Sequence, residues 1–163
     1  MTAGVLPTQG TKLYVVDALS TSVASVLKMA CPTGITGGGG AKDQIEITCL
    51  DTVGNKEYSG GLNNVNPLTV PFNFIPTHPS HQYILTAWKE SGEVLEWMEC
   101  FSDCNDVVPT LDSNDELVFP PAGTAKRFRA YVSDCVIDAA TNEIVRGTLT
   151  LQGTGNEDWQ FAT

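Results

Sequence analysis

Seven side chains offer the most reactive chemistry in this chain of 163 residues, and all of them are cysteine or histidine. They stand at Cys31, Cys49, Cys100, Cys104, Cys135, His78 and His81. The cysteine number is odd, and residues 1–10 show neither the charged start nor the apolar run of an export signal. We therefore expect a reducing compartment and five buried free thiols instead of disulfides.

The alternative role for these residues is a zinc site that joins the two histidines, spaced H-x2-H, to Cys100 and Cys104, spaced C-x3-C. Zinc motifs usually begin with a tighter C-x2-C pair. Histidines near the start of a helix are more often surface residues. The sequence therefore predicts two surface histidines, no metal and no cofactor.

Catalytic patterns are missing from the rest of the chain. It contains no G-x-S-x-G, no H-E-x-x-H and no Walker phosphate loop. The carboxylates Asp115 and Glu116 lie in a Ser/Asn-rich stretch that is typical of solvated surface. The glycine run at residues 37–40 lacks the Lys-Ser/Thr pair of a phosphate loop, so we expect a deformable contact segment. We predict that the protein is not an enzyme.

Charge is more informative than any motif. The chain has 9 Lys and Arg against 19 Asp and Glu, a formal net charge of −10. Binding to nucleic acid or to an anionic membrane surface needs a basic protein surface, which this acidic chain as a whole lacks. No apolar run reaches the roughly 18 residues of a membrane-spanning helix. Nine of the acids fall within residues 90–116, where no Lys or Arg occurs. This block is either a solvated face or the acidic side of a self-assembling subunit.

The elements that must position these residues are mostly strands. Apolar alternation and β-rich runs predict seven short strands, at residues 13–16, 23–30, 43–49, 69–75, 94–101, 124–137 and 144–151. Thr77 or Ser80 can cap one amphipathic helix over residues 79–91, which Gly92 ends. Residues 51–66 are polar and predict a long loop. The fold class is therefore mainly β, a sandwich or barrel with one flanking helix.

The ends of the chain are expected to extend from this fold. Residues 1–11 and 154–163 predict an N-terminal and a C-terminal arm around a single domain at residues 12–153. Such arms have little to pack against within one subunit, which favours self-assembly.

Four stretches together resemble a known family. They are DQIEITCLD (43–51), GGLNNVNPLTVPFNF (60–74), HPSHQYILTAWKESGEVLEWMECF (78–101) and the hairpin AKRFRAYVSDCVIDAATNEIVRGTLTLQGTG (125–155). Their order is similar to that of the tail tube proteins of long non-contractile phage tails. The similar region runs from about Leu13 to Gly155, and the match is one of pattern, with no single diagnostic motif.

The resemblance implies a structural virion protein of the phage tail, assembled in the host cytoplasm. Its copies would form stacked hexameric rings around an inner β-barrel, with the helix outside. The genome and a tape measure protein would occupy the lumen, and tail terminator and tail-tip proteins would bind the ends. A tube subunit like that of type VI secretion is the nearest alternative. A non-enzymatic β-sandwich adhesion module is the second.

The resemblance also implies where subunits touch. Candidate contact residues lie in the glycine run, the 51–66 loop and the C-terminus: Gly37, Gly38, Gly39, Gly40, Asp51, Tyr58, Leu62, Asn66, Trp159 and Phe161.

An acidic lumen would repel DNA phosphates and let the genome pass without binding. Glu93, Glu96 and Glu99 are the candidate lumen residues.

Overall fold

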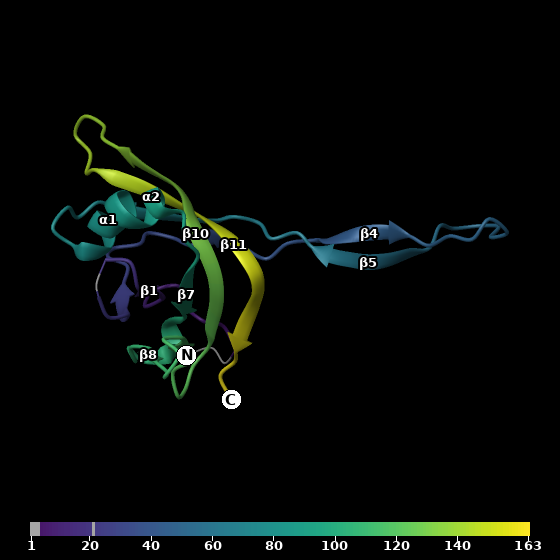
Figure 1. The fold of residues 1–163 in the computed structure, drawn as a ribbon, viewed down its shortest axis with the longest axis horizontal. Coiled ribbons are helices and arrows are strands. Elements are labelled where there is room, and N and C mark those ends of the chain that lie inside the picture. The colour runs from purple at the N-terminus through teal and green to yellow at the C-terminus, as the bar shows by residue number, and fades with distance from the viewer. Residues whose placement is uncertain (1–3, 21) are drawn as a thin grey trace.

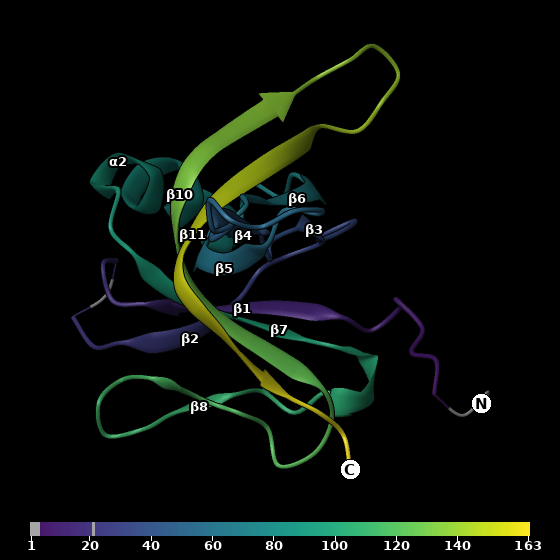
Figure 2. The ribbon, with the colours of Figure 1, turned by 90° about the vertical axis from the view of Figure 1, so that its right-hand side faces the viewer.

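The computed structural model describes residues 4–20 and 22–163. Two long antiparallel strands join the two halves of its main β-sheet. β10 (Ala125–Asp138) and β11 (Arg146–Gln160) lie side by side along their length (Figure 1). The first half of β10 pairs with β7, and the first half of β11 pairs with β6. The sheet is therefore two half-sheets that share one hairpin, as Figure 2 shows.

The sheet has seven strands. In their order across it they are β2 (Ser25–Lys28), β1 (Lys12–Asp17), β7 (Leu95–Cys100), β10, β11, β6 (Leu68–Asn73) and β3 (Thr36–Gly37). All neighbouring strands are antiparallel. With the single helical segment, this confirms the mainly β fold predicted from the sequence.

The helical segment covers one face of the sheet. It consists of α1 (Pro79–Tyr83), a π-helical turn (Ile84–Trp88) and α2 (Lys89–Ser91). The predicted apolar stripe is confirmed, because Trp88 is buried edge-on against Trp97 of β7 with ring centroids 5.9 Å apart. Gly92 ends the helix at φ 64. The cap is His78, whose ring accepts the Ser80 amide, and not Thr77 or Ser80.

The opposite face of β1, β7 and β10 is covered by a small hairpin. After a 3-10 turn (Ser102–Cys104), β8 (Thr110–Leu111) pairs with β9 (Leu117–Val118). Leu117 packs fully buried in a second core with Tyr14 and Met98. The central strands are thus buried on both faces, and the polar stretch 103–116 contains most of the 3-10 turn and the whole of β8.

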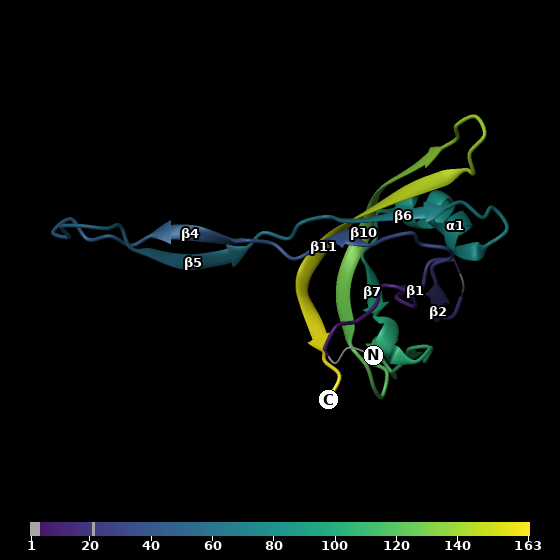
Figure 3. The ribbon, with the colours of Figure 1, turned by 180° about the vertical axis from the view of Figure 1, so that it is seen from behind.

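A second hairpin projects away from the body, as Figures 1 and 3 show. β4 (Lys42–Glu46) pairs with β5 (Tyr58–Asn63) and with no other strand of the described residues. The expectation of a loop over residues 51–66 is therefore wrong in its second half. Gly60 and Gly61 hide the strand signal, because glycine is a poor strand former.

The C-terminus also differs from expectation. Residues 154–160, predicted to be part of an arm, continue β11 and pair with the first half of β10, for example Trp159 with Lys126. The backbone hydrogen bonds of this ladder stabilise a strand whose side chains are polar. At the other end, residues 4–11 precede the first strand, and residues 1–3 lie outside the described part of the chain.

Candidate assembly surfaces

The projecting hairpin, residues 41–66, exposes apolar side chains far from any core. Leu50 and Val53 at its tip are fully exposed, Leu62 is 83% exposed, and Ile45 and Ile47 are about half exposed. An isolated two-stranded hairpin is at best marginally stable in water, and clustered apolar exposure marks a binding surface. The hairpin therefore has the exposure and apolar character expected of a binding surface.

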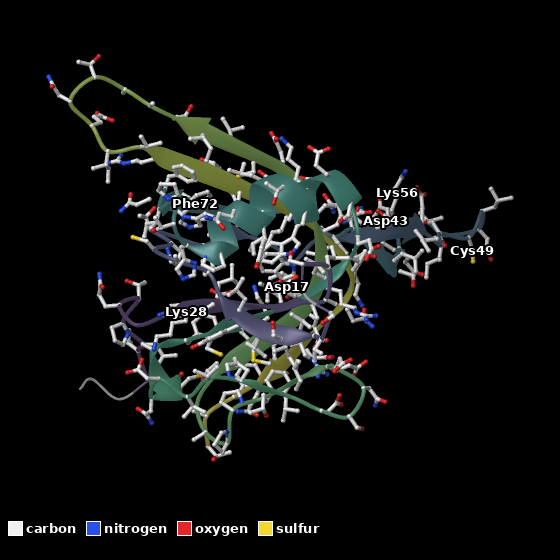
Figure 4. All side chains as sticks on the ribbon, turned by 60° about the vertical axis from the view of Figure 1, so that its left-hand side comes forward. Asp17, Lys28, Asp43, Cys49, Lys56 and Phe72 are labelled. Carbon is white, nitrogen blue, oxygen red and sulfur yellow. The ribbon has the colours of Figure 1, made fainter. Side chains whose placement is uncertain are left out.

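The two faces of the projecting hairpin differ in chemistry. Ile45 and Ile47 share one face, as the alternation predicted, and a side chain at Gly61 would come within 3.2 Å of Ile45. Asp43 lies equally close to Gly61, so this face carries one carboxylate beside the two isoleucines, and the register of the strand pair is irregular there. The other face carries Tyr58 opposite Glu46, which pairs with Lys56 at 3.0 Å. Figure 4 shows Asp43, Lys56 and Cys49 on the hairpin, away from Phe72 in the body.

The glycine run forms the root of the projecting hairpin. All four glycines have positive φ, and the Gly39 amide donates to the Glu157 carboxylate at 3.2 Å. A Cβ on Gly40 would lie 1.4 Å from the carbonyl oxygen of Asn64. Only glycine allows this crossing of the two chain segments. The run therefore sets the direction in which the hairpin leaves the body.

Aromatic rings gather at the C-terminal end of β11. Trp159 stacks between Phe101 and Phe161, with ring centroids 6.1 and 5.8 Å away, and both C-terminal rings are largely exposed. Beside Phe101, residues 6–11 and 32–36 border a groove of about 590 Å³. The structure brings Trp159 and Phe161 together on the body, where Trp159 borders a pocket with Gly39 and Gly40 at the root of the projecting hairpin. Asp51, Tyr58 and Leu62 belong to the hairpin itself.

The three predicted lumen residues lie in different environments. Glu93 is exposed between α2 and β7. Glu96 accepts the Leu117 amide at 3.1 Å, and burial raises the pKa of its carboxyl group. Glu99 is buried, 3.2 Å from the Lys126 ammonium group. Within the subunit, Glu99 therefore forms a buried ion pair with Lys126. Its position relative to a lumen stays a prediction.

His81 and the cysteines have structural environments. His81 is buried, not at the surface as predicted: its Nδ1 accepts the Ile75 amide and its Nε2 donates to the Ala30 carbonyl. With both nitrogens engaged, it has no lone pair for zinc. All five thiols are free, but Cys31 and Cys49 are exposed, which corrects the expectation that all are buried. Burial raises the pKa of Cys135 to about 11.

One surface was not predicted from the sequence, and we call it the open face. It is the side of β10, β11, β6 and β3 that points away from the core beneath the helix. Among its members, placed by strand register, are Thr36, Thr69, Tyr131, Asp134, Val136, Thr148, Thr150 and Gln152. They are mostly uncharged hydroxyl or amide side chains. The sequence feature that could have predicted this face is the alternation of residues 148–152, where polar residues separate the buried Leu149 and Leu151.

Two absences apply to the described residues. None of their helices has the length and apolar character needed to cross a membrane. Nowhere among them do three His, Cys, Asp or Glu side chains gather as a metal site would require.

Comparisons with known proteins point in one direction. Residues 4–163 match the family described as phage tail tube, TTP, lambda-like. The chain is 32% identical to Structural protein 3 of Pseudomonas phage PAJU2 over 155 residues, which cover 93% of this chain and 91% of that protein.

Solved structures share the fold at low identity. The SPP1 tail tube protein superposes with a TM-score of 0.61 at 16% identity, covering 96% of this chain and 80% of that one. A chain from the six-fold symmetric tail of an empty gene transfer agent particle gives 0.65 at 11% identity, covering 96% and 99%. A chain from the sheath/tube terminator of an extracellular contractile injection system gives 0.66 at 15%, covering 98% and 99%.

Proposed function

Because this chain belongs to the lambda-like family of phage tail tube proteins, it is a structural protein of the virion tail, and we propose that its copies form hexameric rings that stack into the tube. The tube is the conduit for the genome during ejection, and the subunit works without catalysis. Family membership favours this role over a type VI secretion tube or an adhesion module.

The projecting hairpin carries the proposal. Its apolar face and tip have no partner within the described part of the subunit, although side chains such as Leu50 and Leu62 expose surface that water disfavours. A hairpin that extends beyond its own body can reach a copy in the next ring. We assign the contact between stacked rings to this hairpin, with Asp51, Tyr58 and Asn66 at its tip, middle and root.

The remaining contact candidates belong to a second surface. Trp159 and Phe161 form an exposed aromatic stack at the end of β11, on the body of the subunit. Aromatic residues are enriched in protein interfaces because they bury large areas at little entropic cost. We assign this stack to contact between copies as well.

The lumen assignment rests on the open face. A ring subunit must turn one sheet face toward the bore, and the helix covers the other side of this half-sheet. Threonine and glutamine side chains offer DNA phosphates no cluster of cations, with Arg129 exposed at one end. In a chain of net charge −10, the genome then passes without being held. Glu93 remains a candidate for the rim of this bore.

Other tail proteins complete the proposed assembly. A tape measure protein would occupy the bore with the DNA, and terminator and tail-tip proteins would bind the ring faces at the two ends. One similar chain was solved in a sheath/tube terminator complex, which supports end contacts of this kind.

Sedimentation of the purified protein tests the proposal. The wild type should form large polymers as its concentration rises, whereas the double variant Leu50→Asp, Val53→Asp should not. Its monomer should melt like the wild type, because both side chains lie away from the body. The matched variant Leu50→Met, Val53→Ile retains apolar character and should polymerise. A wild type that stays monomeric at every concentration, with or without added tail tips, contradicts the function.

A further inference from the structure

Two of the five thiols lie together in the second core, beneath the β8–β9 hairpin. Cys100 ends β7, and Cys104 ends the 3-10 turn that follows it. Both are buried, in one cluster with Tyr14 and Met98. Burial, followed by electrostatic and hydrogen-bond interactions with Cys104, raises the pKa of the Cys100 thiol to about 12. The two thiols are therefore in direct contact.

The turn that carries Cys104 is fixed in place by contacts with Thr124. The Cys104 thiol donates to the Thr124 carbonyl at 3.2 Å, and the same carbonyl accepts the Phe101 amide at 3.1 Å. The Asp103 carboxylate accepts the Thr124 amide at 2.9 Å and the Thr124 hydroxyl at 2.8 Å. Thr124 directly precedes the residue of β10 that pairs with Cys100. One short stretch of chain thus holds both cysteines in position.

Gly123 allows the turn to come this close to the strands. Its φ is 102, and a Cβ there would lie 2.7 Å from the Cα of Cys104 and 2.8 Å from the carbonyl oxygen of Asp103. Any side chain at this position would push the turn, and Cys104 with it, away from the end of β7. The proximity of the two thiols therefore depends on the backbone.

The turn also begins the segment 102–118, which covers the second core. The chain runs from Cys104 into β8 and β9, where Leu117 is fully buried. At its far end the segment is held by hydrogen bonds, because the Leu117 amide donates to Glu96 and the Leu117 carbonyl accepts from Arg127. A bond between Cys100 and Cys104 would attach the start of the segment covalently to β7.

We propose that Cys100 and Cys104 form a disulfide after the virion has left the reducing cytoplasm, and that this bond fixes the segment 102–118 on the sheet. Both thiols are free in the subunit, which corresponds to the compartment of assembly. The inference uses the place of the chain in the virion tail and does not depend on how its copies assemble.

The oxidant is a small external disulfide such as oxidised glutathione. The Cys104 sulfur attacks one of its sulfur atoms, and one glutathione leaves as a thiol. The Cys100 sulfur then attacks the mixed disulfide at Cys104, and the second glutathione leaves. Two electrons and both cysteine protons have passed to the glutathione, and one sulfur–sulfur bond has replaced another.

The environment of the pair makes this reaction slow. The thiolate is the attacking species, and burial raises the pKa of both thiols. The Lys12 ammonium group, on the β1 residue that pairs with Cys100, opposes this shift only in part. Because both thiols are buried, the oxidant reaches them only when the segment 102–118 opens. The bond should therefore form over minutes to hours.

Oxidation of the folded subunit tests the pairing. In a Cys31→Ser, Cys49→Ser background, the remaining thiols are Cys100, Cys104 and Cys135. After incubation with oxidised glutathione and then unfolding, one reactive thiol per chain should remain, and peptide mapping should place the bond between Cys100 and Cys104. Because the bond closes a short loop, the oxidised monomer should melt about 4–8 °C above the reduced one, and reductant should reverse the shift.

Two variants in the same background are the controls. Cys104→Ser should keep two thiols after the same treatment and show no rise in its melting midpoint. Cys135→Ser should form the bond and keep no thiol, because Cys135 belongs to the other core. The thiol titration of the background chain decides the proposal even if the Cys104→Ser variant folds poorly.

The outcomes are distinct from those of the polymerisation test. A folded chain that keeps all three thiols overturns the pairing, as does a bond to Cys135 or a bond between chains. A bond between Cys100 and Cys104 that leaves the melting midpoint unchanged overturns the anchoring of the segment 102–118. None of these results bears on the tube assignment, which sedimentation of the wild type tests separately.

Discussion

Removing the charge of Glu99 should destabilise the subunit severely. Its carboxylate lies 3.2 Å from the Lys126 ammonium group, and the two side chains are only 9% and 8% exposed. Removing one partner of such a pair leaves an uncompensated buried charge, at a cost of about 3–5 kcal/mol. At about 2–4 °C per kcal/mol for a chain of this size, Glu99→Gln should lower the melting midpoint by about 6–20 °C.

Urea and thermal unfolding of four variants measure this effect. Glu99→Gln and Lys126→Met should each be strongly destabilised. The double variant Glu99→Leu, Lys126→Met should recover most of the loss, because an apolar pair can replace a buried ion pair. The exposed Glu93→Gln is the matched control and should change stability by less than about 0.5 kcal/mol. A Glu99→Gln variant as stable as that control would refute the buried pair.

Three further predictions concern other parts of the fold. Burial lowers the pKa of His81 below its ordinary 6.5. The unfolded chain therefore binds the proton first, and the free energy of unfolding falls as pH drops below about 6.5. The unfolding free energy of His81→Gln should depend less on pH in that range, and a pH dependence equal to that of the wild type would contradict this. A thiol reagent should modify Cys31 and Cys49 in the native protein and the three buried thiols only after unfolding, while reductant leaves the melting midpoint unchanged; a drop of several degrees would reveal a disulfide. Gly40→Ala should disturb the root of the projecting hairpin and its polymerisation, whereas Gly60→Ala, whose added Cβ would meet only the flexible Lys42 side chain at 3.3 Å, should polymerise; equal behaviour would show that the crossing at Gly40 is not tight.

Local patterns predicted much of the body. The helix followed from the spacing of Ile84 and Trp88, and β10 followed from its alternation, with Phe128, Ala130 and Val132 on the buried face. In each case the buried face is built from residues within one element, so a short stretch of sequence contains the signal.

The missed elements depend on contacts distant in sequence. β9 forms because Glu96 accepts the Leu117 amide and the Arg127 guanidinium donates to the Leu117 carbonyl. The end of β11 is a strand because β10 pairs with it, although its own residues are polar. Glu99 looked like one of nine similar acids, and only the register that places it beside Lys126 shows that it is buried.

The projecting hairpin could be predicted only in part from the sequence. The alternation of residues 43–49 is consistent with Ile45 and Ile47 on one face, but alternation alone does not say what packs against that face. In the subunit both side chains are exposed. Under the proposed function, a second copy of the chain covers them, and the pattern of one chain does not identify that contact.

The central claim, that copies of this chain build a tube, is tested most directly by negative-stain electron microscopy of the purified protein at high concentration or after addition of tail tips. Hollow tubes of stacked rings are expected, and their end-on averages should have six-fold symmetry. Particles that remain single subunits under all these conditions, or polymers that are solid and lack six-fold symmetry, would contradict it.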